Sequence, residues 1–408
     1  MIDQLNNPGR TFHSTAKTFG ALLAEQLQKD PHFYFFSPDE TTSNKLDAVY
    51  SATARAWGNL PTKEWDLPEA PDGRIIELLS ENVLFALLAG HIKNGEQGML
   101  ASYEAFLSII IPQIVQEVKF YQQSTEVEWR PDYPALNLLS TSTCWRQDHN
   151  GFSHQSPVAI STLLDLPSRR VNCFFPVDDI AAEPIFHQML TSQNVVNLTT
   201  FNKTDEPRWI DSHHAQFQLD NGGASIFRFV SDDPKDINQP LKKPDFVFTA
   251  AGDIATREAI YAIKILKSDL PRLRFRFVGV TALSHRAIGT VDNPLKQATF
   301  DEYFGTDRQA TPIIANFHGY AHTFGDILAE YASRDRIHAH GFSDHGTTTT
   351  PFEMLSMNHA SRYHLALDVA EHLHRPDLTE KYERILRVNK LYTREHGIDL
   401  PPITDFML

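Results

Sequence analysis

Short apolar runs alternate with helix-like stretches along most of the 408-residue chain, and this alternation restricts its fold more than any other feature. The apolar runs are bounded by turn residues, which is typical of strands buried on both faces of a sheet. They lie at residues 33–36, 135–139, 172–177, 195–201, 245–250, 273–280 and 311–317. Strands that alternate with helices favour a mostly parallel sheet, so we predict an α/β fold.

Helices are expected at residues 15–29, 75–90, 104–121, 256–267, 323–332 and 350–373. The helix from residue 104 should bend near Pro112, because proline removes a backbone donor and clashes with the preceding turn. The helix from residue 350 should begin with Thr350 as N-cap and Glu353 as its capping-box partner.

The chain length suits two domains, and a polar stretch suggests where they divide. Residues 231–244 contain Asp-Asp-Pro and Lys-Lys-Pro, which favour a linker. We therefore interpret residues 1–30 as an arm or linker, 31–230 as the first α/β domain and 245–408 as the second.

Composition excludes several function classes. A net charge of −14 makes nucleic acid and anionic membrane surfaces poor partners, although local basic pockets can still hold a phosphate ester. Cys144 and Cys173 form neither a disulfide scaffold nor a C-x-x-C motif, which favours a reducing compartment. The first ten residues lack the apolar core of a signal peptide. We expect a soluble cytoplasmic protein that binds neither membrane nor nucleic acid.

The segment 145–155 (WRQDHNGFSHQ) carries the densest set of chemically active side chains. Its amides and histidines can bind hydroxyl and carbonyl oxygens, and histidine can also move protons near neutral pH. The segment follows a predicted strand, where α/β folds place their sites. A polar surface loop is the alternative interpretation. No cysteine lies near His149 and His154, so no metal site is predicted.

Glu81 and two aromatic residues form a second candidate group. Glu81 lies between apolar stretches, so it can be half-buried with a raised pKa; a helix-start glutamate that faces water is the other interpretation. Tyr103 and Phe106 follow, and an acid with two aromatic rings can hold a planar heterocycle, although such a pair is more often part of a core. Ser43 and Lys203 each follow a predicted strand, and Lys203 can bind a phosphate unless it is merely exposed.

Together these segments resemble the phosphoketolase family. The matching stretches are 37–45 (SPDETTSNK), 102–106 (SYEAF), 145–155 (WRQDHNGFSHQ), 250–253 (AAGD), 317–320 (FHGY), 346–354 (GTTTTPFEM) and 394–397 (REHG). They occur in the family's order, and the stretches WRQDHNGFSHQ and GTTTTPF are specific.

Phosphoketolases are similar to transketolases, whose chains have a diphosphate-binding, a pyrimidine-binding and a C-terminal domain. This sequence resembles only the last two, with the pyrimidine-binding domain at 31–230, and it shows no Gly-Asp-Gly…Asn motif. The resemblance implies thiamine diphosphate as cofactor, with Mg²⁺ held by the missing domain. It also implies an oligomer with a partner chain that carries that domain, so we expect a natural half-enzyme or a truncated product.

The implied reaction cleaves xylulose 5-phosphate or fructose 6-phosphate with inorganic phosphate, giving acetyl phosphate and an aldose phosphate. By resemblance, Glu81 binds the aminopyrimidine ring, and Tyr103 and Phe106 form its aromatic wall. The residues implied for substrate binding and proton transfer are Gln147, His149, Asn150 and His154, with His149 and His154 as acid–base groups. Ser43 and Lys203 are the implied phosphate contacts.

Three departures from the family lie near the implied cofactor pocket. Asn82 stands where the family usually has histidine, Ala321 where it has proline, and residues 94–98 read NGEQG where TGRHG is usual. Two further hypotheses therefore stay open: the β-type half of another thiamine-diphosphate enzyme, and a non-catalytic partner of a complete phosphoketolase.

Overall fold

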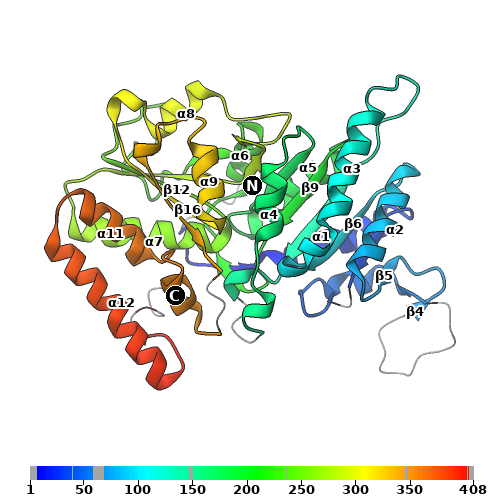
Figure 1. Cartoon of the computed structure of the whole chain (residues 1–408), viewed down its shortest axis with the longest axis horizontal. Coiled ribbons are helices and arrows are strands. Elements are labelled where there is room, and N and C mark those ends of the chain that lie inside the picture. The colour runs from blue at the N-terminus through cyan, green and yellow to red at the C-terminus, as the bar shows by residue number, and fades with distance from the viewer. Residues whose placement is uncertain are drawn as a thin grey trace.

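The computed structural model describes residues 7–38, 40–57, 69–146, 150–236, 238–344, 348–401 and 403. It confirms the predicted α/β fold, with two mostly parallel sheets and helices packed around them (Figure 1). Helices α2 and α3 lie at one end of the molecule and α11 and α12 at the other. None of the helices in these ranges is long and apolar enough to cross a membrane.

The first sheet has ten strands, and every neighbouring pair from β8 to β4 is parallel. In spatial order they are β15 (Ala287–Ile288), β14 (Ala282–Ser284), β8 (Val171–Phe174), β9 (Val196–Thr200), β7 (Leu136–Thr141), β6 (Gly98–Tyr103), β2 (Tyr34–Ser37), β5 (Ile75–Glu77), β3 (Arg55–Ala56) and β4 (Glu69–Ala70). Its helices are α1 (Thr15–Lys29), α2 (Glu81–Lys93), α3 (Ile111–Ser124), α4 (Val158–Asp165), α5 (Ala182–Thr191) and α6 (Ser212–Asp220). A separate two-stranded sheet pairs β1 (Phe12–Ser14) with β10 (Asp205–Pro207).

The second sheet has five strands, of which only the edge strand β11 is antiparallel to its neighbour. The order is β11 (Ala224–Ile226), β13 (Phe275–Val280), β12 (Phe246–Ala251), β16 (Ile313–Tyr320) and β17 (Ile337–Phe342). The helices of this part are α7 (Asp253–Asp269), α8 (Gln297–Phe304), α9 (Ala321–Leu328), α10 (Pro351–Met357), α11 (Arg362–His372) and α12 (Pro376–His396).

The two sheets exchange strands across the predicted domain boundaries. Strand β11 lies within the predicted first domain but pairs with β13 of the second sheet. Conversely, β14 and β15 come from the C-terminal part and extend the first sheet, with β14 antiparallel to β8. Helix α1, which we had assigned to an arm or linker, instead buries Phe19 and Leu23 completely, so it belongs to the core.

Three helix predictions need correction. Residues 75–90 hold strand β5 before α2 begins, and residues 104–110 form a 3₁₀ helix (η2, Glu104–Ile110) before α3. Pro112 lies in the first turn of α3, where its missing donor costs little, so the helix starts there and does not bend.

The predicted helix 350–373 is two helices, α10 and α11. His359 between them has a φ of 56°, in the left-handed region that a continuing right-handed helix excludes. The Thr350 side chain does not cap α10, because its hydroxyl donates to Asp399 Oδ1 at 2.5 Å. Asp399 takes over the capping role by accepting the Phe352 N–H at 2.9 Å.

Candidate active site

The carboxyl ends of three parallel strands bring Ser43, Tyr103 and Lys203 together. Tyr103 ends β6, while Ser43 and Lys203 follow β2 and β9. Ser43 Oγ lies 3.0 Å from the Tyr103 hydroxyl, and Lys203 Nζ lies 5.2 Å from the centre of the Tyr103 ring. Parallel strands present their carboxyl ends at one edge of a sheet, and this places residues 60 or more positions apart in one group.

Tyr103 and Phe106 form an aromatic surface beside this group. Their rings are nearly parallel, with an interplanar angle of 4° and centroids 6.0 Å apart. The His154 ring packs edge-on against both, 5.2 Å from Phe106 and 6.0 Å from Tyr103. Both aromatic side chains are half-buried, so part of their surface is open to a ligand.

Glu40 is a functional candidate that we did not predict. Its Oε2 accepts the Tyr103 N–H at 3.1 Å. Burial raises the pKa of Glu40 to about 8 and the nearby Glu81 carboxylate adds to the rise, although the Tyr103 N–H and Lys203 oppose it. Glu40 therefore keeps its proton near neutral pH. The Asp-Glu pair within the stretch 37–45 was the available signal, because it follows a strand as Ser43 does.

Glu81 is the first residue of α2 and is half-buried. The helix N-terminus favours a negative charge at this position. The neighbouring Asn82 donates from Nδ2 to Gln113 Oε1 at 3.0 Å, and Gln113 donates back to the Asn82 carbonyl at 3.1 Å. This pair fixes the start of α2 against α3.

Only part of the segment 145–155 can be placed, because Gln147 and His149 lie outside the described residues. Asn150 is half-buried, and His154 Nδ1 lies 2.8 Å from Ser153 Oγ. Gly151 has a φ of 73°, which favours glycine, and the Thr348 hydroxyl fills the space where a side chain at 151 would begin. Gly151 therefore packs against Thr348, which lies in the C-terminal part of the chain.

Comparison with known proteins gives matches along nearly the whole chain. The family model for D-xylulose 5-phosphate/D-fructose 6-phosphate phosphoketolase matches residues 17–192, and the model for that family's C-terminal domain matches residues 203–408. A probable phosphoketolase of Rhodopseudomonas palustris (strain TIE-1) is 34% identical over 412 residues, covering 98% of this chain and 51% of the relative. The chain thus spans about half the length of the curated relatives it matches.

Solved structures with the same fold include transketolases. A Pichia stipitis transketolase mutant in complex with xylulose 5-phosphate has a TM-score of 0.67 at 14% identity, covering 91% of this chain and 47% of that chain. A split-gene transketolase, described as an inactive β4 tetramer, has a TM-score of 0.60 at 15% identity, covering 88% of this chain and 97% of that chain.

Proposed function

Because the chain belongs to the phosphoketolase family, we propose that it provides the pyrimidine-binding and C-terminal domains of a thiamine-diphosphate enzyme. The proposed reaction is the phosphate-dependent cleavage of xylulose 5-phosphate or fructose 6-phosphate to acetyl phosphate and an aldose phosphate. One observation carries the proposal: the acid Glu40, an aromatic surface, a histidine and a lysine meet at the carboxyl edge of one parallel sheet.

The site has the chemistry that a thiamine pyrimidine ring requires. The half-buried rings of Tyr103 and Phe106 offer aromatic surface for stacking, and Glu81 offers a carboxyl group for a ring nitrogen. When bound, thiamine diphosphate supplies the nucleophilic carbon that cleaves a carbon–carbon bond beside a ketose carbonyl. We assign the binding of the ring to Tyr103, Phe106 and Glu81.

Lys203 and Ser43 are the proposed contacts for the sugar phosphate. Glu40 holds a proton at neutral pH, so it does not neutralise the ammonium group of Lys203, which can pair with a phosphate as a point charge. His154 is held at Nδ1 by Ser153, so Nε2 is the atom that we assign to proton exchange with the substrate. Gln147, His149 and Asn150 stay proposed substrate contacts from the family resemblance.

An exposed apolar surface next to Glu81 supports a partner chain. Leu79 is 80% exposed, and Val83, Leu87 and Ile109 are each close to half exposed. Ile109 adjoins this face, because Asn82 donates to its carbonyl at 3.4 Å. Exposed apolar patches of this kind mark interaction surfaces. We propose that a chain carrying the diphosphate-binding domain and Mg²⁺ covers it, as a subunit division of the split-gene type would require.

Reconstitution tests the proposed reaction. The purified chain is combined with a diphosphate-binding half of a phosphoketolase, and complex formation is verified by size-exclusion chromatography. We expect acetyl phosphate from xylulose 5-phosphate only when both chains, thiamine diphosphate, Mg²⁺ and inorganic phosphate are present. Transfer to an added aldose phosphate without acetyl phosphate would indicate a transketolase-type half. A stable complex with neither activity would show that the chain is a non-catalytic partner.

A further inference from the structure

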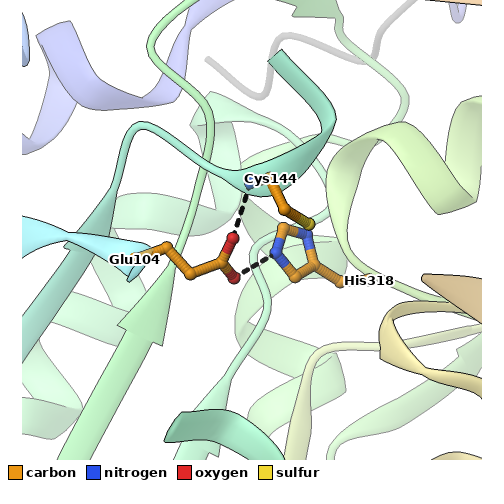
Figure 2. A group of neighbouring side chains, drawn as sticks. All are labelled: Glu104, Cys144 and His318. Atoms are coloured by element: carbon orange, nitrogen blue, oxygen red, sulfur yellow. Dashed lines mark hydrogen bonds and ion pairs between the residues drawn. The ribbon is translucent and has the colours of Figure 1, made fainter. Parts of the chain in front are cut away.

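Glu104, Cys144 and His318 meet in the interior between the two sheets (Figure 2). Glu104 and His318 are 0% and 2% exposed. The Glu104 carboxylate has two close contacts: His318 Nε2 lies 2.6 Å from Oε1, and the Cys144 N–H donates to Oε2 at 2.6 Å. Both carboxylate oxygens are therefore engaged by groups that can donate a hydrogen bond.

These three side chains carry metal-type donor atoms within 4.8 Å of one another, but their geometry does not suit a metal ion. Two ligands bound tetrahedrally to zinc at about 2.0–2.1 Å would lie about 3.3 Å apart, well beyond the 2.6 Å between His318 Nε2 and Glu104 Oε1. Burial, reinforced by Glu104, raises the pKa of the Cys144 thiol well above its usual range, so the thiol stays protonated beside the Glu104 carboxylate. Hydrogen bonding accounts for the cluster.

The contact between Glu104 and His318 connects the candidate site to the second domain at several points. Glu104 directly follows Tyr103 of the aromatic surface, and Cys144 precedes the segment 145–155. His318 belongs to β16 of the second sheet, and its carbonyl accepts the Trp145 indole N–H at 2.8 Å. The contact between Glu104 and His318 thus joins two parts of the site, the aromatic surface and the start of the segment 145–155, to strand β16, which lies outside the site.

We propose that Glu104 and His318 form a positioning pair, which keeps the aromatic surface and the start of the segment 145–155 in register with the second domain. The pair acts through a buried hydrogen bond between an imidazolium and a carboxylate. This inference is independent of the proposed function, because it concerns contacts within the chain and requires neither cofactor nor partner.

The charge of the pair should make its strength depend on pH. The groups that face the His318 ring are Glu104 on η2, the Cys144 thiol and Asp253 on α7. Burial alone lowers the pKa of His318, but Glu104 and Asp253 outweigh it and raise the pKa above its usual value. A raised histidine pKa contributes stability that is complete below about pH 6.5 and is lost as pH rises through the folded-state pKa.

Two substitutions separate the hydrogen bonds from the charge. Alanine in place of Glu104 removes both acceptor oxygens, so the Cys144 N–H and the His318 ring lose their partner at every pH. Glutamine in place of His318 places an N–H donor close to the position of Nε2 but cannot ionise. The first change should weaken the connection at every pH, whereas the second should remove only its pH dependence.

Hydrogen exchange on the full chain, followed by mass spectrometry between pH 6 and 9.5 and corrected for intrinsic rates, tests the pair. In the wild type we expect the protection of residues 103–106 and 144–146 to fall about five- to tenfold as His318 loses its proton, because a hydrogen bond between charged groups is stronger than a neutral one by about that factor. His318→Gln should give a profile without this fall. Glu104→Ala should lose about five- to 150-fold of protection throughout, the cost of one unpaired buried donor.

Two control variants test whether the pH dependence of protection belongs to His318. His340→Gln removes the ionisable ring from the 2.7 Å contact between His340 and Asp368, a histidine–carboxylate pair within the second domain, and should leave the profiles of residues 103–106 and 144–146 unchanged. Asp253→Asn removes one negative neighbour of His318, so the fall in protection should move to lower pH. A fall that persists in His318→Gln would overturn the proposal. So would unchanged protection in Glu104→Ala; if that variant does not fold, His318→Gln decides alone.

Discussion

Replacing Glu81 with glutamine is expected to lower acetyl phosphate formation by the reconstituted enzyme about a hundredfold or more. Glutamine keeps the shape of the side chain but cannot share a proton with a ring nitrogen, and losing a proton-transfer group typically costs that much. Glu81 is half-buried at the first position of α2, so unfolding should change little. The measurement is the initial rate at saturating thiamine diphosphate, together with thermal unfolding of the isolated chain.

Glu183→Gln is the matched control for this substitution. Glu183 is an exposed acid in the first turn of α5, so its replacement removes a similar favourable interaction with a helix N-terminus but leaves the site intact. We expect wild-type activity from this variant. Equal rates for the two variants would mean that Glu81 takes no part in the chemistry.

Replacing Arg362 with methionine is expected to reduce the free energy of unfolding by about 3–5 kcal/mol, the usual cost of breaking a buried ion pair. Glu258 is fully buried, and Arg362 donates to it from Nε at 2.8 Å, from a terminal guanidinium nitrogen at 2.7 Å and from its backbone N–H at 2.9 Å. Methionine fills part of the space but leaves the Glu258 charge with weaker compensation. Urea unfolding at pH 7 measures the loss.

The same pair gives a pH dependence of known sign. Burial alone raises the pKa of Glu258, but Arg362, with help from Arg257, holds it at about 2. A depressed carboxyl pKa contributes stability above the unfolded value near 4.5 and loses it as pH falls toward 2. The deficit of the methionine variant should therefore shrink with acidification over this range.

Arg375→Met is the control, because Arg375 and Asp377 form an exposed pair at the start of α12 that should matter little. An Arg362 variant as stable as this control would show that the buried pair contributes no net stability.

Local sequence patterns predicted where helices and strands lie along the chain better than they predicted how these elements pack together. The bounds of α1 agree with the predicted 15–29, because Ser14 caps the helix and its apolar residues repeat at helical spacing. Its place in the core depends on contacts such as Phe19 stacked on Phe201 at 4.4 Å, 182 positions away, which no local pattern contains. Pro112 illustrates the same limit, because proline is compatible with either a bend within a helix or the first turn of a helix. The residues before it form a 3₁₀ helix, so Pro112 lies in the first turn of α3.

The residues of the candidate site likewise divide into those that the sequence indicated and those that only the fold brings together. Ser43 and Lys203 follow predicted strands and were assigned from the family resemblance, and the parallel sheet brings them to Tyr103. Glu40 was missed because its raised pKa comes from burial and from Glu81, neither of which is visible near it in the sequence. The contact between Glu104 and His318 joins residues 214 positions apart, and only the two-sheet architecture brings them together.

A structure of the reconstituted complex with thiamine diphosphate most directly tests whether this chain holds the pyrimidine ring. We expect the ring to lie against Tyr103 and Phe106, with the Glu81 carboxyl group about 2.6–3.2 Å from a ring nitrogen. A bound cofactor whose ring lies elsewhere, or whose ring nitrogen has no contact with Glu81, would contradict the assignment.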